Sequence, residues 1–333
     1  MKEFRTWLRH LLIGAALLAS VIFSMSGCGK EDGKIAVVSK LHNGDAKFFQ
    51  GRVWTGVEGN LTSFDLHGKD RRTYDIKVNW IACLDEKDLL VYGNSAGEVG
   101  MVHFDGDNNV TGNDVILSSR NLLIDPAIAR SGEDFFLTVT EVTGNVNNDD
   151  PGKENGDYVL HFYSSKDLKK WDHVSDVLHE RHNIEDVDIM AEDKAIICVY
   201  EKETVDKGRS AICLKKSEDK GRTWCEEKIL LAADADQEPA CFVKEDGGFC
   251  LYYSSDISSP GRSYMGAGAY RASFDRSFKR LGPGQIIPTG TKEGILLYDM
   301  AVIGGRRYFL YARNYLTDCD LVIEEEPGGS YEH

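Results

Sequence analysis

The chain has 333 residues, of which 28% are charged and 10% are aromatic, and its formal net charge at pH 7 is −15. So acidic a surface argues against binding to nucleic acid and against electrostatic adhesion to anionic lipid, because both partners are polyanions. Short apolar or alternating runs and 33 glycines predict an all-β chain with many tight turns. After the N-terminal segment, no stretch carries the long apolar period of an amphipathic helix.

Residues 1–27 have the organisation of a secretion signal, so we exclude them from the fold. Basic residues stand in the first ten positions, an apolar core covers residues 11–25, and small residues precede Cys28. This resembles a bacterial lipoprotein signal, which implies lipid attachment at Cys28, a tether over residues 28–33 and anchoring at the bacterial cell surface or in the periplasm. A plain secretory signal is one alternative. A transmembrane anchor is disfavoured, because spanning a bilayer takes about 20 apolar residues.

The first repeated units follow this segment. A strand is expected over residues 34–39, and two shorter strand pairs end at Asp65 and Asp105, 40 residues apart, each before a polar turn that contains glycine. Repeats of this length are typical of the four-stranded blades of β-propellers. The sequence therefore predicts two blades before residue 120.

The most regular turn covers residues 217–224 and reads Ser-Glu-Asp-Lys-Gly-Arg-Thr-Trp. We expect the Asp219 carboxylate to accept backbone N–H groups of its own turn, Gly221 to supply a positive φ, and Trp224 to pack under the hairpin. The motif resembles the Asp-box of sialidases and related β-propellers. Its structural positions would be Ser217, Asp219, Gly221, Thr223 and Trp224.

A second periodic element is an acidic residue before a small apolar segment and a strongly apolar strand. It recurs at Asp125, at Asp186 or Asp188, at Glu238 and at Asp299. These repeats predict four more blades. The last, from about residue 296 to 326, has room for only three strands, so residues 34–39 are expected to supply its outer strand and leave no edge unpaired. We therefore predict one six-bladed β-propeller over residues 34–327, followed by a tail at 328–333, with a five-bladed ring as the alternative.

Cysteines and oxygen ligands give weaker indications. Seven cysteines follow Cys28, mostly within apolar strands, where we expect buried free thiols rather than a disulfide between Cys241 and Cys250. No zinc motif is present in the sequence. The loop at 147–157 is rich in oxygen ligands and could hold Ca²⁺, but it lacks fixed ligand spacing, so we expect a solvated loop and no cofactor.

The repeated acids indicate a functional site. Inner strands of a propeller start near one mouth of the channel, so the acidic residues before them are expected to converge. Converging carboxylates raise the pKa of some members and leave one protonated beside an ionised partner, as glycoside hydrolysis requires. The structural alternative is that each acid caps its strand by accepting backbone N–H groups.

Two resemblances to hydrolases are present. The pattern of residues 50–326 is similar to sialidases, which implies Tyr298 as nucleophile, Glu238 as its activator and Asp125 as general acid. In that family arginines bind the substrate carboxylate. The candidates here are Arg262, Arg271 and Arg313.

The second resemblance is to arabinanase, xylosidase and fructosidase propellers, which have five blades. It implies a general base in the segment beginning at Asp125, a general acid in the segment beginning at Glu238, and Asp188 as the carboxylate that tunes the acid. The phrase at Tyr264–Tyr270 is typical of that group. A propeller that binds glycan without hydrolysis is the third reading. In each case we expect a monomer that acts on a glycan and touches the membrane only through its lipid.

Overall fold

The computed structural model describes most of the chain after the predicted signal. The described ranges are 34–41, 43–84, 88–144, 156–181, 183–192, 195–203, 208–245 and 247–327. The predicted signal, the tether with Cys28, the tail and most of the loop at 147–157 lie outside them. Within the described ranges, no helix has the length and apolar character needed to cross a membrane.

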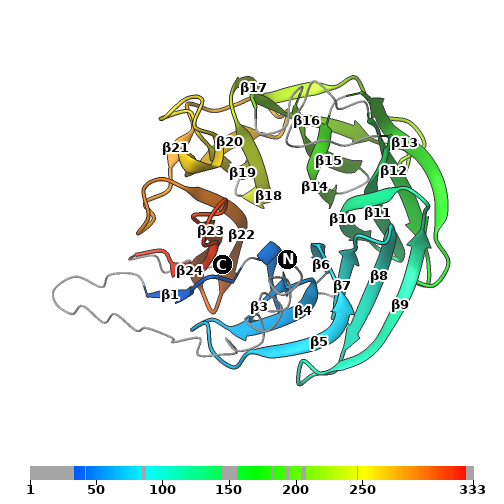
Figure 1. Ribbon diagram of the computed structural model, residues 1–333. Coiled ribbons are helices and arrows are strands. Elements are labelled where there is room, and N and C mark those ends of the chain that lie inside the picture. Colours follow the sequence, from blue (N-terminus) through cyan, green and yellow to red (C-terminus); the bar gives the residue numbers. More distant parts are fainter. Residues whose placement is uncertain are drawn as a thin grey trace, which may run out of the picture.

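The described strands form six four-stranded antiparallel sheets arranged as blades around an axis (Figure 1). The first three blades contain β2 (Asn43–Phe49), β3 (Arg52–Val57), β4 (Asn60–Asp65) and β5 (Arg72–Lys77); β6 (Trp80–Leu84), β7 (Leu89–Gly93), β8 (Glu98–Phe104) and β9 (Val110–Ser118); and β10 (Leu122–Ser131), β11 (Asp134–Thr143), β12 (Asp157–Ser165) and β13 (Asp172–Glu180). The next two contain β14 (Asn183–Glu192), β15 (Ala195–Glu203), β16 (Ser210–Ser217) and β17 (Lys228–Ala235); and β18 (Gln237–Glu245), β19 (Gly248–Ser255), β20 (Gly268–Asp275) and β21 (Gln285–Ile286).

The sixth blade closes the ring with both ends of the chain. It contains β22 (Ile295–Ile303), β23 (Arg306–Arg313) and β24 (Asp320–Glu325), and its outer strand is β1 (Ile35–Val38). Strand β1 pairs antiparallel with β24, from Ile35 opposite Glu324 to Val38 opposite Leu321. The prediction that the strand at 34–39 completes the last blade is confirmed, and the ring has six blades rather than the five of the alternative.

Apolar side chains pack between neighbouring blades and hold the ring together. Trp54 is fully buried; its indole N–H donates to the Phe49 carbonyl of its own blade at 3.2 Å, and its ring packs edge-on against Phe104 of the next blade. Burying a large apolar side chain of this kind contributes about 1.5–3 kcal/mol. Five of the seven described cysteines are buried, and Cys241 and Cys250 are separate thiols that form no disulfide.

Aspartates order the hairpins between the third and fourth strands of five blades. Each carboxylate accepts backbone N–H groups from the residues that follow it; the five are Asp65, Asp105, Asp167, Asp219 and Asp275. In the turn of Asp219, the N–H of Thr223 donates to Oδ1 at 2.9 Å and its hydroxyl donates to Oδ2 at 2.7 Å. Gly221 has φ +80°, and the Trp224 ring packs edge-on against Phe162. The hydrogen bonds expected for this turn are therefore present.

Candidate functional site

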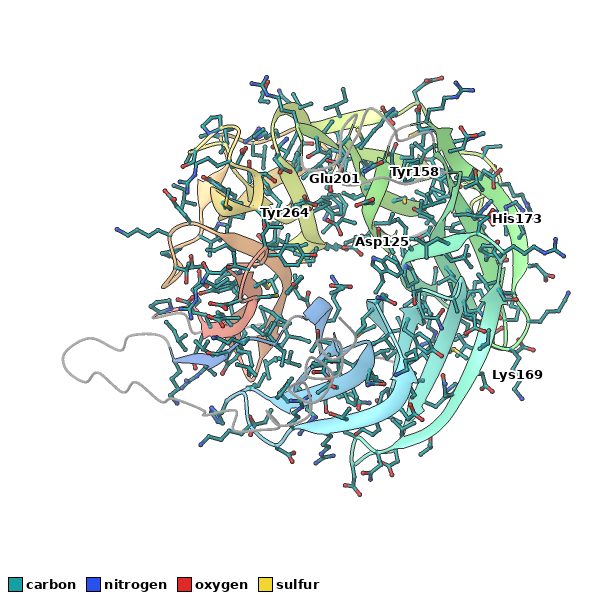
Figure 2. All side chains as sticks on the ribbon, viewed as in Figure 1. Asp125, Tyr158, Lys169, His173, Glu201 and Tyr264 are labelled. Atoms are coloured by element: carbon teal, nitrogen blue, oxygen red, sulfur yellow. The ribbon has the colours of Figure 1, made fainter. Side chains whose placement is uncertain are left out.

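A cavity of about 510 Å³ lies where the inner strands of the six blades meet. Its lining includes seven acidic residues and one lysine: Asp45, Asp125, Glu185, Asp186, Asp188, Glu238, Asp299 and Lys47. Figure 2 shows Asp125 beside the central channel, with Glu201 on the fourth blade and Tyr264 on the fifth. Among the described residues that line the cavity, none is an arginine.

β-Bulges aim these acids into the channel. The pairing of the first two strands shifts register next to an acidic residue in five of the six blades. At two of these bulges the acid itself has a positive φ, +46° for Asp125 and +48° for Asp186. Aspartate tolerates this conformation better than most residues, and a bulge re-aims the side chain that it carries. The repeated acidic residues of the sequence thus mark the irregular points of the inner strands.

Three of the acids are struts between adjacent blades. Each accepts the N–H of the next residue and an N–H of the following blade's inner strand. The bonds run to Asp45 from Ala46 (2.7 Å) and Ile81 (3.0 Å), to Asp188 from Ile189 (2.8 Å) and Phe242 (2.7 Å), and to Asp299 from Met300 (2.9 Å) and Phe48 (2.7 Å). For Asp188 and Asp299, the structure shows the backbone contacts expected of the strand-capping alternative.

Lys47 supplies the positive charge between these struts. Its ammonium group donates to the carbonyl of Tyr298 at 2.8 Å and to that of Ala240 at 3.2 Å, which links three blades. Burial lowers the pKa of Lys47, but the carboxylates of Asp45, Asp299 and Asp188 outweigh this effect and hold the pKa above its usual range. Burial also raises the pKa of Asp299 to about 7, in spite of Lys47. Lys47 was not singled out from the sequence.

The second group of acids is a cluster of carboxyl groups in mutual contact. Carboxylate oxygens of Asp186, Glu201 and Glu238 all lie within 4.8 Å of one another. Glu238 is 6% exposed and Glu201 is 1% exposed. Burial, followed by the charges of Glu201 and Asp186, raises the pKa of Glu238 well above its usual value. Three carboxyl groups in such contact cannot all be ionised, so the cluster retains protons.

Two further groups complete this cluster. The Tyr264 side chain is hydrogen-bonded to Glu238, and burial raises the pKa of the tyrosine. Asp125 accepts the backbone N–H of Asp186 at 3.0 Å, and burial together with Asp186 and Glu185 raises its pKa well above the usual value. The structure therefore brings the predicted residues Asp125 and Glu238 to one cavity.

The other predicted residues do not join this cluster. Asp188 and Tyr298 line the cavity, but the Tyr298 hydroxyl is buried beside Cys319, and the hydroxyl that contacts Glu238 belongs to Tyr264. The arginines bind other partners and do not line the described cavity: Arg262 pairs with Glu293 (2.6 Å), Arg271 with Gln285 (3.0 Å) and Arg313 with Asp320 (2.7 Å). The described residues therefore do not form the arrangement of tyrosine, glutamate and arginines that the sialidase resemblance implied.

Comparisons with known proteins give similarities to solved structures only. No protein-family model and no curated protein matches the chain. Similar structures include the xylan β-1,4-xylosidase of Bacillus halodurans C-125 (19% identity, 62% of this chain and 42% of that chain, TM-score 0.43) and an α-L-arabinanase of Penicillium chrysogenum (12%, 72% and 89%, 0.49). A sialidase of Trypanosoma rangeli is also similar (11%, 78% and 56%, 0.41). The neighbours thus include the three groups that the sequence resembles, and no inference about activity rests on similarity this low.

Proposed function

We propose that this propeller is a glycoside hydrolase that cleaves neutral glycans with carboxyl groups alone. The observation that carries the proposal is the position of Glu238 at the wall of the axial cavity, in contact with two other carboxyl groups and with Tyr264. Burial, followed by the charges of Glu201 and Asp186, raises the pKa of Glu238 well above its usual value and so favours its protonated form. A protonated carboxylic acid that faces a cavity is what a leaving glycosidic oxygen needs as a proton donor.

The roles follow from burial and contacts. Glu238 donates its proton to the leaving oxygen, while Asp186 and Glu201 are positioning residues that keep this proton in place between turnovers. Asp125 is the partner carboxyl group on the opposite side of the scissile bond; in its ionised form, which the N–H of Asp186 favours, it takes a proton from the attacking water. Asp188, predicted to tune the acid, is held by two backbone N–H groups instead, so we assign that role to Asp186 and Glu201.

The charge of the cavity favours a neutral sugar. An acidic sugar such as sialic acid would meet seven acidic residues and a lysine already engaged by two carbonyls. Aromatic side chains of Trp80, Tyr264 and Tyr315 also line the cavity and offer flat apolar surfaces to a sugar ring. We therefore favour chemistry of the arabinanase or xylosidase type over that of a sialidase.

The test uses aryl glycosides of neutral sugars whose leaving groups differ in pKa. Glu238→Gln should lower kcat/KM by about 10²–10⁴ with poor leaving groups and much less with good ones, because only poor leaving groups need the proton. Asp125→Asn should lower kcat/KM for both kinds. Glu218→Gln, a change at an exposed hairpin, is the matched control and should have no effect.

Two outcomes would overturn this assignment. One is a Glu238→Gln variant as active as the unmodified protein on poor leaving groups. The other is saturable binding of neutral oligosaccharides without turnover of any glycoside, which would favour a glycan-binding propeller. That second function draws support from Asp45, Asp188 and Asp299, whose carboxylates already bind backbone N–H groups.

We also propose that a lipid on Cys28 anchors the protein outside the cytoplasm. The support is the sequence alone: a basic start, an apolar core and small residues before the cysteine. Mass spectrometry of the N-terminal peptide should find cleavage before Cys28 and a diacylglyceryl group bound to its sulfur as a thioether, and Cys28→Ala should release the protein from the membrane fraction. An unmodified Cys28 peptide would contradict the proposal.

A further inference from the structure

A group of nitrogen and oxygen ligands lies on the outer strands of the third blade, away from the axial cavity. It consists of His161 on β12 and His173 and Asp176 on β13, and one ligand atom from each lies within 4.8 Å of the others. Asp176 Oδ1 is 2.7 Å from His161 Nδ1 and 2.9 Å from His173 Nε2. Figure 2 shows His173 at the outer edge of the ring, whereas Asp125 lies beside the channel.

The local backbone explains why these side chains meet. His161 pairs with Asp176 across the two strands, and Tyr163 pairs with His173. Two residues three apart on a regular strand point to opposite faces, but the β12–β13 pairing shifts register twice here and turns His173 to the face of Asp176. The Tyr163 ring then packs edge-on against both imidazoles.

The second ring nitrogen of His161, Nε2, is paired with a carboxylate that other side chains hold in place. His161 Nε2 lies 3.1 Å from Glu141 Oε2, and the other oxygen of Glu141 accepts the Asn121 amide at 3.1 Å and the Ser119 hydroxyl. An imidazole that gives its far N–H to a carboxylate presents its other nitrogen, here Nδ1, as a metal ligand, and metal-binding histidines almost always have such a partner. Glu141 therefore orients His161 for coordination.

We propose that His161 Nδ1, His173 Nε2 and Asp176 Oδ1 bind a divalent first-row transition metal ion, with Zn²⁺ as the reference ion and a fourth position open to water. Zinc takes imidazole and carboxylate ligands at about 2.0–2.2 Å in a tetrahedral arrangement. Two ligand atoms on such an ion are about 3.4 Å apart. The distances from Asp176 Oδ1 to His161 Nδ1 and to His173 Nε2 must therefore each increase by roughly half an ångström. Both side chains are nearly half exposed and free to do so.

The ion would neutralise the site and tie together two strands. Two carboxylates, Asp176 and Glu141, face the histidines, so a doubly charged cation balances the local charge. It would replace the protons between Asp176 and the two imidazoles and cross-link β12 to β13. Because a metal that binds the folded state alone stabilises it by mass action, the blade should become more resistant to heat in the presence of the ion.

Calorimetric titration of the purified full chain with ZnCl₂, followed by thermal unfolding with and without Zn²⁺, tests this inference. The expected result is one ion per chain at this site and a higher Tm with zinc. His173→Ala and Asp176→Asn should each weaken binding more than tenfold, and Glu141→Gln by about tenfold. His179→Ala, which removes an exposed histidine on the same strand, should leave the affinity unchanged.

The inference is overturned if the protein shows no saturable zinc binding, or if both His173→Ala and Asp176→Asn bind zinc as tightly as the unmodified protein. Zinc that remains bound in these variants would belong to the acidic cluster or to a thiol instead. Asp176→Asn preserves the size of the side chain, so the test holds even if the histidine variant fails to fold. Visible absorption of Co²⁺ in the same variants provides a second readout of imidazole coordination.

Discussion

Aspartates at the two ends of the blades act in opposite ways. Near the start of the inner strands, Asp299 accepts two backbone N–H groups inside the channel, and burial raises its pKa to about 7. At the other end, Asp219, which is partly exposed in its surface turn, accepts the backbone N–H and the hydroxyl of Thr223, and these hydrogen bonds lower its pKa to about 2. Both carboxylates are hydrogen-bonded, so burial rather than bond number decides which one holds a proton.

The channel itself contains a second contrast. The struts Asp45, Asp188 and Asp299 share the positive charge of Lys47, which offsets part of their burial. In the cluster, Glu238 has only carboxyl groups and a tyrosine hydroxyl as its nearest polar side chains. A proton is the remaining way to reduce the negative charge there. The struts thus favour structure and the cluster favours acid chemistry, although the same repeat of the sequence supplies both.

The largest expected effect comes from removing the shared cation. Lys47→Met leaves three partly buried carboxylates without their counter-charge, and the cost of breaking a fully buried ion pair, about 3–5 kcal/mol, sets the upper limit of the effect. The free energy of unfolding, measured by urea denaturation, should fall by up to that amount. Lys170→Met, at an exposed ion pair, should change it little. A Lys47→Met variant as stable as the unmodified protein would show that the struts do not depend on this charge.

The next effect is a change in how stability depends on pH. With a folded pKa of about 7, Asp299 binds a proton that the unfolded chain has already lost, so its stabilising contribution is complete below about pH 4 and disappears as pH rises through 7. Asp299→Asn should remove this part of the decline, on the order of 2 kcal/mol between pH 5 and pH 8. Unfolding at the two pH values measures it, and identical slopes in both proteins would contradict the pKa argument.

The smallest effect is expected at the exposed end. Asp219→Asn weakens the hydrogen bonds that the carboxylate accepts from the N–H and the hydroxyl of Thr223, and it should lower Tm by a few degrees at neutral pH. Because the pKa of Asp219 is lowered, its contribution is present above about pH 4 and is lost as pH falls towards 2, so the Tm difference should narrow in acid. Asp234→Asn, on an exposed strand position, is the control. A Tm difference that grows as pH falls would be inconsistent with this turn.

Sequence reasoning found the ring but only part of the site. The closing strand and the acids at Asp125 and Glu238 follow from repeat spacing, since a propeller places equivalent positions around one axis. Repeat spacing could not decide which of Asp186 and Asp188 is the site residue, because residues two apart on a regular strand point the same way. The bulge, with a positive φ at Asp186, separates them into a cluster member and a strut.

The missed residues share a physical reason. Glu201 lies in an apolar second strand, Tyr264 in a single turn of 3-10 helix and Lys47 in a strand that carries no repeat signal. Glu201 and Lys47 act through contacts with another blade, and Tyr264 reaches Glu238 from the connection between two strands of its own blade. The direction of such side chains depends on bulges and loop paths that spacing does not encode. The arginines show the converse. Arginine was expected to bind a substrate carboxylate, but Arg271 and Arg313 have partners within their own blades, and Arg262 pairs with Glu293 in the connection between the fifth and sixth blades.

Infrared difference spectroscopy tests the central claim most directly, since it detects protonated carboxyl groups whatever the substrate. At pH 7 the protein should show the C=O stretch of neutral carboxylic acids, and Glu238→Gln should remove part of this band while Glu218→Gln leaves it unchanged. A spectrum at pH 7 with only ionised carboxylates, or a band that survives the loss of Glu238 intact, would contradict the account.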